Sequence, residues 1–265
     1  MKFNESYTKY WKSSIEKSID GTIIAGPKQA KEILDLLQIG KINSILDLGC
    51  SFGRMHEVLS NFGENIYGED VDEYAVNKAK SYPYYQLKVG SAEETGFAKD
   101  LFELVFCWAV FDVVNHQKGF YEINRILKSG GQILLTGKND LYYSDDELAF
   151  KAEKNAYLKN FPNHFTDLRA VIKNIDALGF KLERILLFPH RGSLGLLEYT
   201  DFEIGSDKII ECYEYLILCS KTHHPDFKDI AKITLDSRFS KTAIKKSKEF
   251  GFNNVEDYFN SIGIS

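Results

Sequence analysis

The sequence contains no long apolar segment. Across its 265 residues no stretch approaches the roughly 18 uninterrupted apolar residues that a membrane-spanning helix needs. The opening segment MKFNESYTKYWKSS also lacks the apolar core of about 7 to 15 residues that defines a signal peptide. We therefore expect a protein that neither crosses a membrane nor is secreted through a signal peptide.

Cysteine is scarce, and its spacing is not that of a metal site. No CxxC pair occurs among the four cysteines, which are Cys50, Cys107, Cys212 and Cys219. Structural zinc sites need Cys and His ligands at close, regular spacing. The sequence therefore predicts no metal site, and it is typical of a reduced, cytoplasmic setting.

Basic clusters are absent as well. No run of four Lys or Arg occurs, and 38 Asp and Glu residues outnumber 33 Lys and Arg residues, for a net charge of -5. Such a chain has no general attraction to phosphate polymers. We therefore expect a small-molecule partner, with no nucleic acid and no membrane, while a homodimer stays open.

What the sequence does contain is a regular alternation of strand-like and helix-like segments. A helix is predicted over residues 27–40, with Pro27 in its first turn and Gly40 at its end. Apolar strands are predicted at 44–48, 65–69, 84–90, 103–110 and 132–137, and helix-like stretches separate them. This pattern predicts the α/β class, with a Rossmann-like, doubly wound sheet.

The regular alternation of strands and helices ends after residue 137. Two helices and two strands are predicted at 140–160, 164–180, 181–190 and 213–221, with Thr166 as the N-cap of the second helix. We predict three parts: an N-terminal helical cap over 1–40, a domain over 41–220 with a substrate-side elaboration at about 138–200, and a C-terminal helical extension over 221–265.

Residues 45–53, Ile-Leu-Asp-Leu-Gly-Cys-Ser-Phe-Gly, join a buried strand to a loop of small residues. Such a loop lets backbone N–H groups and a helix N-terminus approach a ligand closely. Asp70 follows Gly49 by 21 residues, at the end of the next strand, where an acid can accept hydrogen bonds from ribose hydroxyls. Glu69 or Asp72 could share this role. The loop lacks the G-x-G-x-x-G pattern of dinucleotide sites, which disfavours an NAD-dependent oxidoreductase.

This stretch closely resembles the first motif of class I S-adenosylmethionine-dependent methyltransferases, an acid followed by Gly-x-Gly-x-Gly, with Ser51 in place of the middle glycine. The resemblance extends over about residues 40–140, through KVGSAEETGF and through the strand, helix and Gly-Gly turn of FELVFCWAVFDVVNHQKGFYEINRILKSGGQILLTG. It implies S-adenosylmethionine as the cofactor and a seven-stranded, mostly parallel sheet whose last strand is antiparallel. The residues expected around the cofactor are Asp47, Gly49, Cys50, Ser51, Gly53, Glu69, Asp70, Ser91, Ala92, Glu93, Cys107, Trp108 and Ala109.

The methyl acceptor should bind beyond the carboxyl ends of the parallel strands. The residues predicted to bind it, with the first two forming a lid, are Tyr10, Trp11, Asp112, Lys138, Tyr142, Tyr143 and Arg191. Lys138 and Arg191 are suited to a phosphate group. If the acceptor is a hydroxyl, we expect His190 to be the general base, with His164 second.

Two absent motifs narrow the acceptor. The fourth predicted strand ends in CWAVFD, without the Asn/Asp-Pro-Pro-aromatic signature of exocyclic base amine methylation, and no Pro-Cys nucleophile is present. We therefore predict methyl transfer to a small polar metabolite, such as the hydroxyl of a sugar or of a nucleotide-linked sugar. The alternatives are a cofactor-binding scaffold without transfer activity and an RNA or protein methyltransferase.

Overall fold

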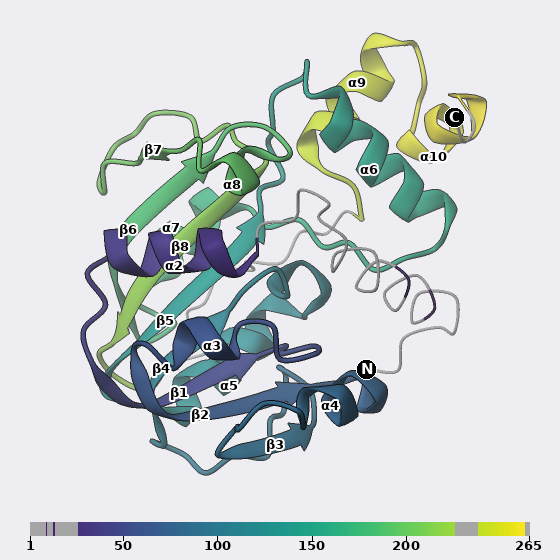
Figure 1. Ribbon diagram of the computed structural model, residues 1–265. Coiled ribbons are helices and arrows are strands. Elements are labelled where there is room, and N and C mark those ends of the chain that lie inside the picture. The colour runs from purple at the N-terminus through teal and green to yellow at the C-terminus, as the bar shows by residue number, and fades with distance from the viewer. Residues whose placement is uncertain (1–8, 10–12, 14–25, 226–237, 263–265) are drawn as a thin grey trace.

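The computed structural model describes residues 9, 13, 26–225 and 238–262. Its centre is a sheet of eight strands in the order β3-β2-β1-β4-β5-β8-β6-β7 (Figure 1). The strands are β1 (Ile42–Leu48), β2 (Gly63–Asp70), β3 (Gln86–Val89), β4 (Phe102–Cys107), β5 (Leu127–Lys138), β6 (Phe180–Phe188), β7 (Thr200–Asp201) and β8 (Glu214–Lys221).

The strand directions confirm the predicted Rossmann-like class. Strands β3, β2, β1, β4 and β5 are mutually parallel, and the last strand, β8, runs antiparallel to both β5 and β6. The carboxyl ends of β1, β2, β4 and β5 therefore meet at one edge of the sheet. In open α/β sheets this edge is where ligands bind.

Helices cover both faces of the sheet (Figure 1). The helices are α2 (Pro27–Leu36), α3 (His56–Leu59), α4 (Glu73–Ala79), α5 (His116–Ile126), α6 (Glu147–Leu158), α7 (Leu168–Asn174), α8 (Ser193–Leu196), α9 (Lys241–Glu249) and α10 (Val255–Ile262), with a 3₁₀ turn at Phe111–Val113. Apolar side chains of α5 and α7 pack in one core cluster, and those of α2, α3 and α8 pack in another. None of the helices in the described part of the chain is long and apolar enough to cross a membrane.

Three details differ from the sequence prediction. The sheet has eight strands instead of seven, because the connection between β6 and β8 contributes the two-residue β7, which pairs with β6. The helix predicted before the Gly130-Gly131 turn ends at Ile126, and β5 begins at the next residue, so that the two glycines lie within the strand. Asp167, not Thr166, caps α7: its carboxylate accepts the N–H of Ala170 at 2.9 Å, whereas the Thr166 hydroxyl accepts a bond from Tyr215.

The described part of the C-terminal extension is helical, as predicted. Helices α9 and α10 pack against α6, to one side of the sheet (Figure 1). An aromatic cluster around Phe259, Tyr258 and Phe239 joins them, with Phe150 and Tyr157 of α6 against it. The division of the chain into three parts stays a proposal.

Candidate cofactor and acceptor site

The loop that follows β1 has the backbone conformation that its small residues allow. Gly49, Ser51 and Gly53 have φ angles of 77°, 49° and 82°, in the left-handed region that favours glycine. A Cβ atom on Gly49 would lie 2.2 Å from a Val110 methyl group. The N–H groups of Gly49 and Cys50 both donate to the Glu69 carbonyl oxygen, at 2.7 and 2.9 Å. The loop is therefore fixed against the end of β2, where a side chain at its first glycine would not fit.

Asp70 ends β2 and lies beside this loop. One carboxylate oxygen accepts the N–H of Ser51 at 3.0 Å, and the other accepts the N–H of Asp72 at 2.9 Å. Burial raises the pKa of Asp70, while these backbone bonds act to lower it. Each oxygen keeps further acceptor capacity, so the carboxylate is placed where a diol bound to the loop could donate to it.

The two alternative acids have other surroundings. The carboxyl group of Glu69 is buried against Gly90, and neither of its oxygens has a hydrogen-bond partner among the described residues. Burial raises the pKa of Glu69 to about 9, so that this carboxyl group is protonated at neutral pH. Asp72 caps α4 by accepting the N–H of Tyr74 at 2.9 Å. Among the described contacts of these three acids, the carboxylate of Asp70 is the one that bonds to the loop, whereas Glu69 contacts it through its backbone carbonyl.

A second buried acid, Asp47, lies near the end of β1. Its carboxylate accepts a hydrogen bond of 2.7 Å from the hydroxyl of Tyr84. Burial raises the pKa of Asp47 to about 7, although the Tyr84 bond and the charge of Arg54 oppose the rise. The sequence reasoning missed both partners. Arg54 could have been found from the sequence, because it directly follows Gly53 of the loop. Tyr84 could not, because it is 37 residues from Asp47 and only the fold brings the two together.

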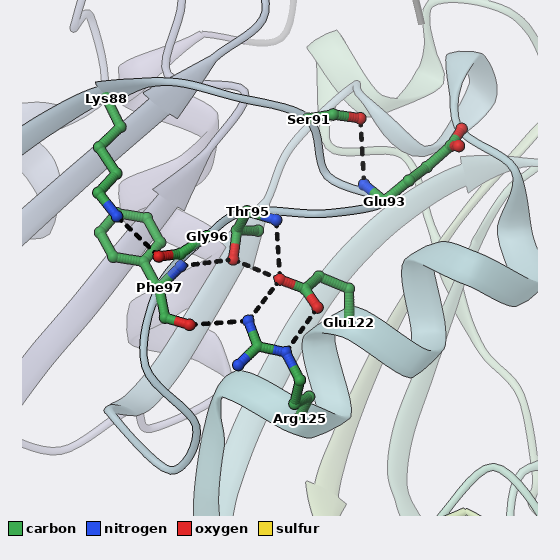
Figure 2. Close-up of polar contacts among 8 residues, drawn as sticks. All are labelled: Lys88, Ser91, Glu93, Thr95, Gly96, Phe97, Glu122 and Arg125. Carbon is green, nitrogen blue, oxygen red and sulfur yellow. Dashed lines mark hydrogen bonds and ion pairs between the residues drawn. The ribbon is translucent and has the colours of Figure 1, made fainter.

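The segment after β3 forms a compact turn. The N–H of Glu94 donates to the Ser91 carbonyl at 2.8 Å. Figure 2 shows the second bond of the turn, in which the N–H of Glu93 donates to the Ser91 hydroxyl at 3.3 Å. The Glu93 carboxylate accepts the N–H of Asn115, at the start of α5, at 2.9 Å. Ala92 is buried beside this turn. Ser91, Ala92 and Glu93, which were predicted to lie around the cofactor, are therefore held next to the helix that follows β4.

The residues at the end of β4 divide between the core and the edge of the sheet. Cys107 and Trp108 are buried in different core clusters, and the Trp108 ring stacks on Phe106 with centroids 5.5 Å apart. Ala109 is exposed, with a φ of 57°, and its N–H donates to the Thr136 hydroxyl at 2.7 Å. The backbone at Ala109 thus reaches the ligand edge, while the Trp108 side chain packs in the core.

Polar groups from distant segments gather at the ends of β4 and β5. The Lys138 ammonium group lies 2.5 Å from the Asp112 carboxylate and donates to the Asn163 side chain at 2.8 Å. The N–H of His164 donates to the Asp112 carbonyl at 2.7 Å. Burial acts to lower the pKa of Lys138, but the charge of Asp112, the neighbouring Tyr213 and the hydrogen bond to Asp112 together outweigh it and raise that pKa. We call Asp112, Lys138, Asn163 and His164 the acceptor-side cluster.

Arg191 lies on an adjacent part of the same edge. Its guanidinium group donates to the Tyr213 hydroxyl at 2.8 Å, and its N–H donates to Asp146 at 2.7 Å. His190 is half exposed, stacks on Tyr143 at 5.2 Å, and lies 3.9 Å from the Asp145 carboxylate. Of the two predicted base candidates, only His164 is in the acceptor-side cluster.

Tyr142 has a different environment from the one expected for an acceptor-binding residue. Its side chain is buried, and its hydroxyl donates to Glu153 at 2.6 Å. This places it in the packing between α6 and the C-terminal extension, so we leave it out of the proposed acceptor site. Tyr10 and Trp11 lie outside the described residues.

The loop after β1 fits S-adenosylmethionine on two observations of this structure. The Ser51 hydroxyl is buried without a hydrogen-bond partner among the described residues, and a buried polar group in that state is costly unless a ligand pairs with it. A Cβ atom on Gly49 or Gly53 would clash with the side chain of Val110 or of Tyr82, so the close packing of this loop requires glycine at both positions. A small-residue loop with an unpaired hydroxyl and an adjacent acid suits a ligand with polar ends and a ribose.

Comparison with known proteins gives the same assignment. Residues 46–135 match a family model described as a methyltransferase domain. The chain is 30% identical over 149 residues to the tRNA N(3)-methylcytidine methyltransferase trm140 of Schizosaccharomyces pombe, which covers 49% of this chain and 47% of the relative. It is 29% identical over 113 residues to protein 235L of Invertebrate iridescent virus 6, whose name describes it provisionally as a methyltransferase, over 40% of this chain and 41% of the relative. The chain thus spans less than half the length of these relatives.

Solved structures share the fold. A SAM-dependent methyltransferase from Thermotoga maritima has a TM-score of 0.59 and 17% identity, over 82% of this chain and 99% of its own. A second, from Archaeoglobus fulgidus, has a TM-score of 0.55 and 15% identity, over 80% of this chain and 100% of its own.

These findings define the class of the domain. Residues 46–135 match the methyltransferase domain model, and the sheet around them has the Rossmann-like fold of the solved S-adenosylmethionine-dependent methyltransferases. The resemblance read from the sequence is confirmed. The cofactor of this class is S-adenosylmethionine, as predicted.

Proposed function

We propose that this protein transfers a methyl group from S-adenosylmethionine to a small polar metabolite. The observation that carries the proposal is the hydrogen bond between the Ser51 N–H and the Asp70 carboxylate, which joins the small-residue loop to an acid at the neighbouring strand end. The Ser51 hydroxyl, which has no hydrogen-bond partner among the described residues, and Arg54 would hold the methionine part of the cofactor. Asp70 would accept from the ribose, and Ser91, Ala92 and Glu93 would lie along the adenine.

Bound S-adenosylmethionine supplies a methyl group on a positively charged sulfur, which an acceptor atom attacks in line. The chain's own task is to hold that acceptor near-collinear with the methyl group and to exclude water. The acceptor-side cluster lies at the ends of β4 and β5, where an acceptor would meet the cofactor. There Asp112 and Lys138 form a fixed ion pair with hydrogen-bonding capacity left over on both partners.

A hydroxyl acceptor also requires a base. The His164 imidazole is partly buried, and burial lowers its pKa even though the charges of Asp112 and Glu93 act to raise it. A neutral imidazole can accept the acceptor's proton at neutral pH. We therefore favour His164 over the half-exposed His190 as the base. A sugar or nucleotide-linked sugar hydroxyl is the acceptor that this arrangement suits, with Arg191 near enough to the edge to meet a phosphate.

The similarity to a tRNA methyltransferase favours one competing acceptor, an RNA. The net charge of -5 speaks against it, because RNA binding depends on clustered positive charge. The deciding experiment incubates the protein and S-adenosylmethionine carrying a labelled methyl group with a cell extract, with and without ribonuclease. Label in the small-molecule filtrate that persists after ribonuclease supports the proposal.

Label that is retained in RNA or protein would instead identify a macromolecular acceptor. If the protein bound the cofactor but transferred no methyl group to any component of the extract, the result would favour the alternative of a cofactor-binding scaffold. Calorimetry with S-adenosylmethionine, S-adenosylhomocysteine and NAD is the companion measurement, since binding of NAD alone would contradict the cofactor assignment.

A further inference from the structure

A partly buried ion pair on α5, between Glu122 and Arg125, contacts the segment that follows the Ser91 turn. Glu122 is 4% exposed. Its carboxylate accepts the N–H and the hydroxyl of Thr95, at 2.7 and 2.5 Å, and two guanidinium N–H groups of Arg125, at 2.8 and 2.7 Å (Figure 2). Four hydrogen bonds therefore converge on one carboxylate, and two of them come from a segment that is neither helix nor strand.

The same ion pair also holds the next residues of that segment. Arg125 donates to the Phe97 carbonyl at 2.7 Å, and Lys88 donates to the Gly96 carbonyl at 2.9 Å while its ammonium group lies 4.2 Å from the centre of the Phe97 ring (Figure 2). Thr95, Gly96 and Phe97 are thus each fixed by a charged side chain. The turn at Ser91 to Glu94 is directly attached to this fixed segment.

The charge and hydrogen bonds of Glu122 indicate that the segment carrying the Ser91 turn is held rigidly against α5. Burial acts to raise the pKa of Glu122, but the bonds from Arg125 and Thr95 outweigh it and hold that pKa below its usual range, so the carboxylate stays charged. Hydrogen bonds to charged groups are about twice as strong as neutral ones. Without Glu122, the buried Thr95 N–H would lose its partner. The position of the Ser91 turn is therefore set from α5, outside the turn itself.

We infer that Glu122 and Arg125 are positioning residues for cofactor recognition, which hold the Ser91 turn at the distance from which its polar atoms recognise the exocyclic amine of adenine. This inference rests on the proposed role of Ser91 in cofactor binding. Neither residue is proposed to touch the cofactor; Glu122 acts through Thr95, and Arg125 acts through Phe97. Their loss should consequently change which base is preferred, as well as how tightly it is held.

The test compares two ligands, S-adenosylhomocysteine and S-inosylhomocysteine, in which a carbonyl oxygen replaces the exocyclic amine. Calorimetry on the full chain should show that the wild type prefers the first by about tenfold, the value of a good hydrogen bond. In Glu122→Gln, this preference should fall to about twofold or less. Thr95→Ala removes the bond that the hydroxyl donates to Glu122 and the bond that it accepts from the Phe97 N–H, but it keeps the backbone bond to Glu122. It should therefore give a smaller change in the same direction, even if Glu122→Gln folds poorly.

The matched control is Glu103→Gln. Glu103 also accepts from a lysine, Lys128, at 2.7 Å and from a backbone N–H, that of Asn43, at 2.8 Å, but it lies on β4 away from the turn. This variant should keep the wild-type ratio. A merely structural role for Glu122 would weaken both ligands equally and leave the ratio unchanged, which would overturn the inference.

Equal affinity of the wild type for the two ligands would also overturn it, because the turn would then not recognise the amine. If the wild type bound neither ligand, the cofactor assignment itself would fail, and the inference with it. These outcomes are distinct, since the last one is seen before any variant is made.

Discussion

The carboxylate of Asp70 accepts the backbone N–H of Ser51 across 3.0 Å, so the end of β2 holds the loop that follows β1. Its second oxygen accepts the N–H of Asp72, at the start of α4. Asp70 therefore organises the loop, in addition to the ribose contact that we propose for it. Holding the loop and binding a ribose both depend on the two oxygens of the Asp70 carboxylate.

Replacement of Asp70 by Ala should raise the dissociation constant for S-adenosylmethionine by roughly 10- to 100-fold, the value of one charged hydrogen bond. Calorimetry on the folded variant measures it. Asp72→Ala is the control, because Asp72 caps α4 and should affect stability more than affinity. An unchanged constant in Asp70→Ala would move the ribose contact to another acid.

The conformation of the loop after β1 could be predicted because it depends on residues that are neighbours in the sequence. Small residues between an apolar strand and a helix limit the backbone to a few conformations, and Gly49 and Gly53 adopt the positive φ angles that such a loop requires. Ser51 shares that conformation despite its side chain. The acid at the end of β2 was likewise predictable, since parallel neighbouring strands end at the same edge.

A substitution of Gly49 should disrupt this loop. In Gly49→Ala, the added methyl group would lie 2.2 Å from Val110 on a backbone with a φ of 77°, so we expect the affinity for the cofactor to fall at least about tenfold and the free energy of unfolding by roughly 1 to 3 kcal/mol. Gly40→Ala is the matched control, because nothing lies within 4 Å of its Cβ position. Denaturant titration and calorimetry measure both; equal behaviour of the two variants would contradict the prediction.

Asp47 should make stability depend on pH. Burial raises its pKa from 3.8 to about 7 in the folded chain, so the folded state keeps a proton that the unfolded state has lost between those values. The free energy of unfolding should therefore fall as pH rises from about 4 to 7, by up to about 1.4 kcal/mol per pH unit, and level off above.

The measurement is the difference between wild type and Asp47→Asn in urea titrations without cofactor. The Asn variant should gain relative stability across this pH range. Tyr84→Phe removes a hydrogen bond that lowers the pKa of Asp47. In this variant the free energy of unfolding should therefore keep falling to a higher pH. If the free energies of unfolding of wild type and Asp47→Asn changed with pH in the same way, Asp47 would not have the raised pKa on which this prediction depends.

Contacts between distant segments were beyond the sequence reasoning. Tyr84 and Asp47, or Glu122 and Thr95, are joined only when the strands between them are arranged, and polar residues of these types are common on any surface. Tyr142 shows the opposite error: its aromatic ring beside a strand end suggested an acceptor contact, whereas packing of α6 against the C-terminal extension buries it. The short β7 carries too few residues for any periodicity.

The C-terminal extension should depend on one buried acid. Glu153 accepts the hydroxyl of Tyr142 and both the N–H and hydroxyl of Ser240, at 2.6 to 2.8 Å. The Ser240 hydroxyl also caps α9, accepting the N–H of Ala243 at 2.9 Å. Ser240→Ala should therefore destabilise the extension by about 1 to 3 kcal/mol.

Hydrogen exchange of the α9 amides measures this loss, and the affinity for the cofactor should stay unchanged. Ser261→Ala is the control, because that hydroxyl is exposed on α10 and bonds only within its own turn. Normal protection of α9 in Ser240→Ala would show that the aromatic cluster alone holds the extension.

The last prediction concerns the base. If the acceptor is a hydroxyl, His164→Ala should lower turnover by about 10² to 10⁴-fold, the usual contribution of a general base. His190→Ala should keep near-full turnover, because that ring is half exposed and stacks on Tyr143. His116 is a poor candidate, since it is fully buried against Phe111 and burial lowers its pKa to about 4.

Turnover against pH separates these roles. A base that must be neutral gives a fall in turnover on the acid side, and His164→Ala should lose that fall along with the rate, while the affinity for the cofactor, measured separately, stays the same. The reverse result, with His190→Ala inactive, would restore the preference drawn from the sequence. If both variants keep the wild-type rate and pH profile, neither histidine is the base, and the acceptor either is deprotonated by Asp112 or needs no deprotonation.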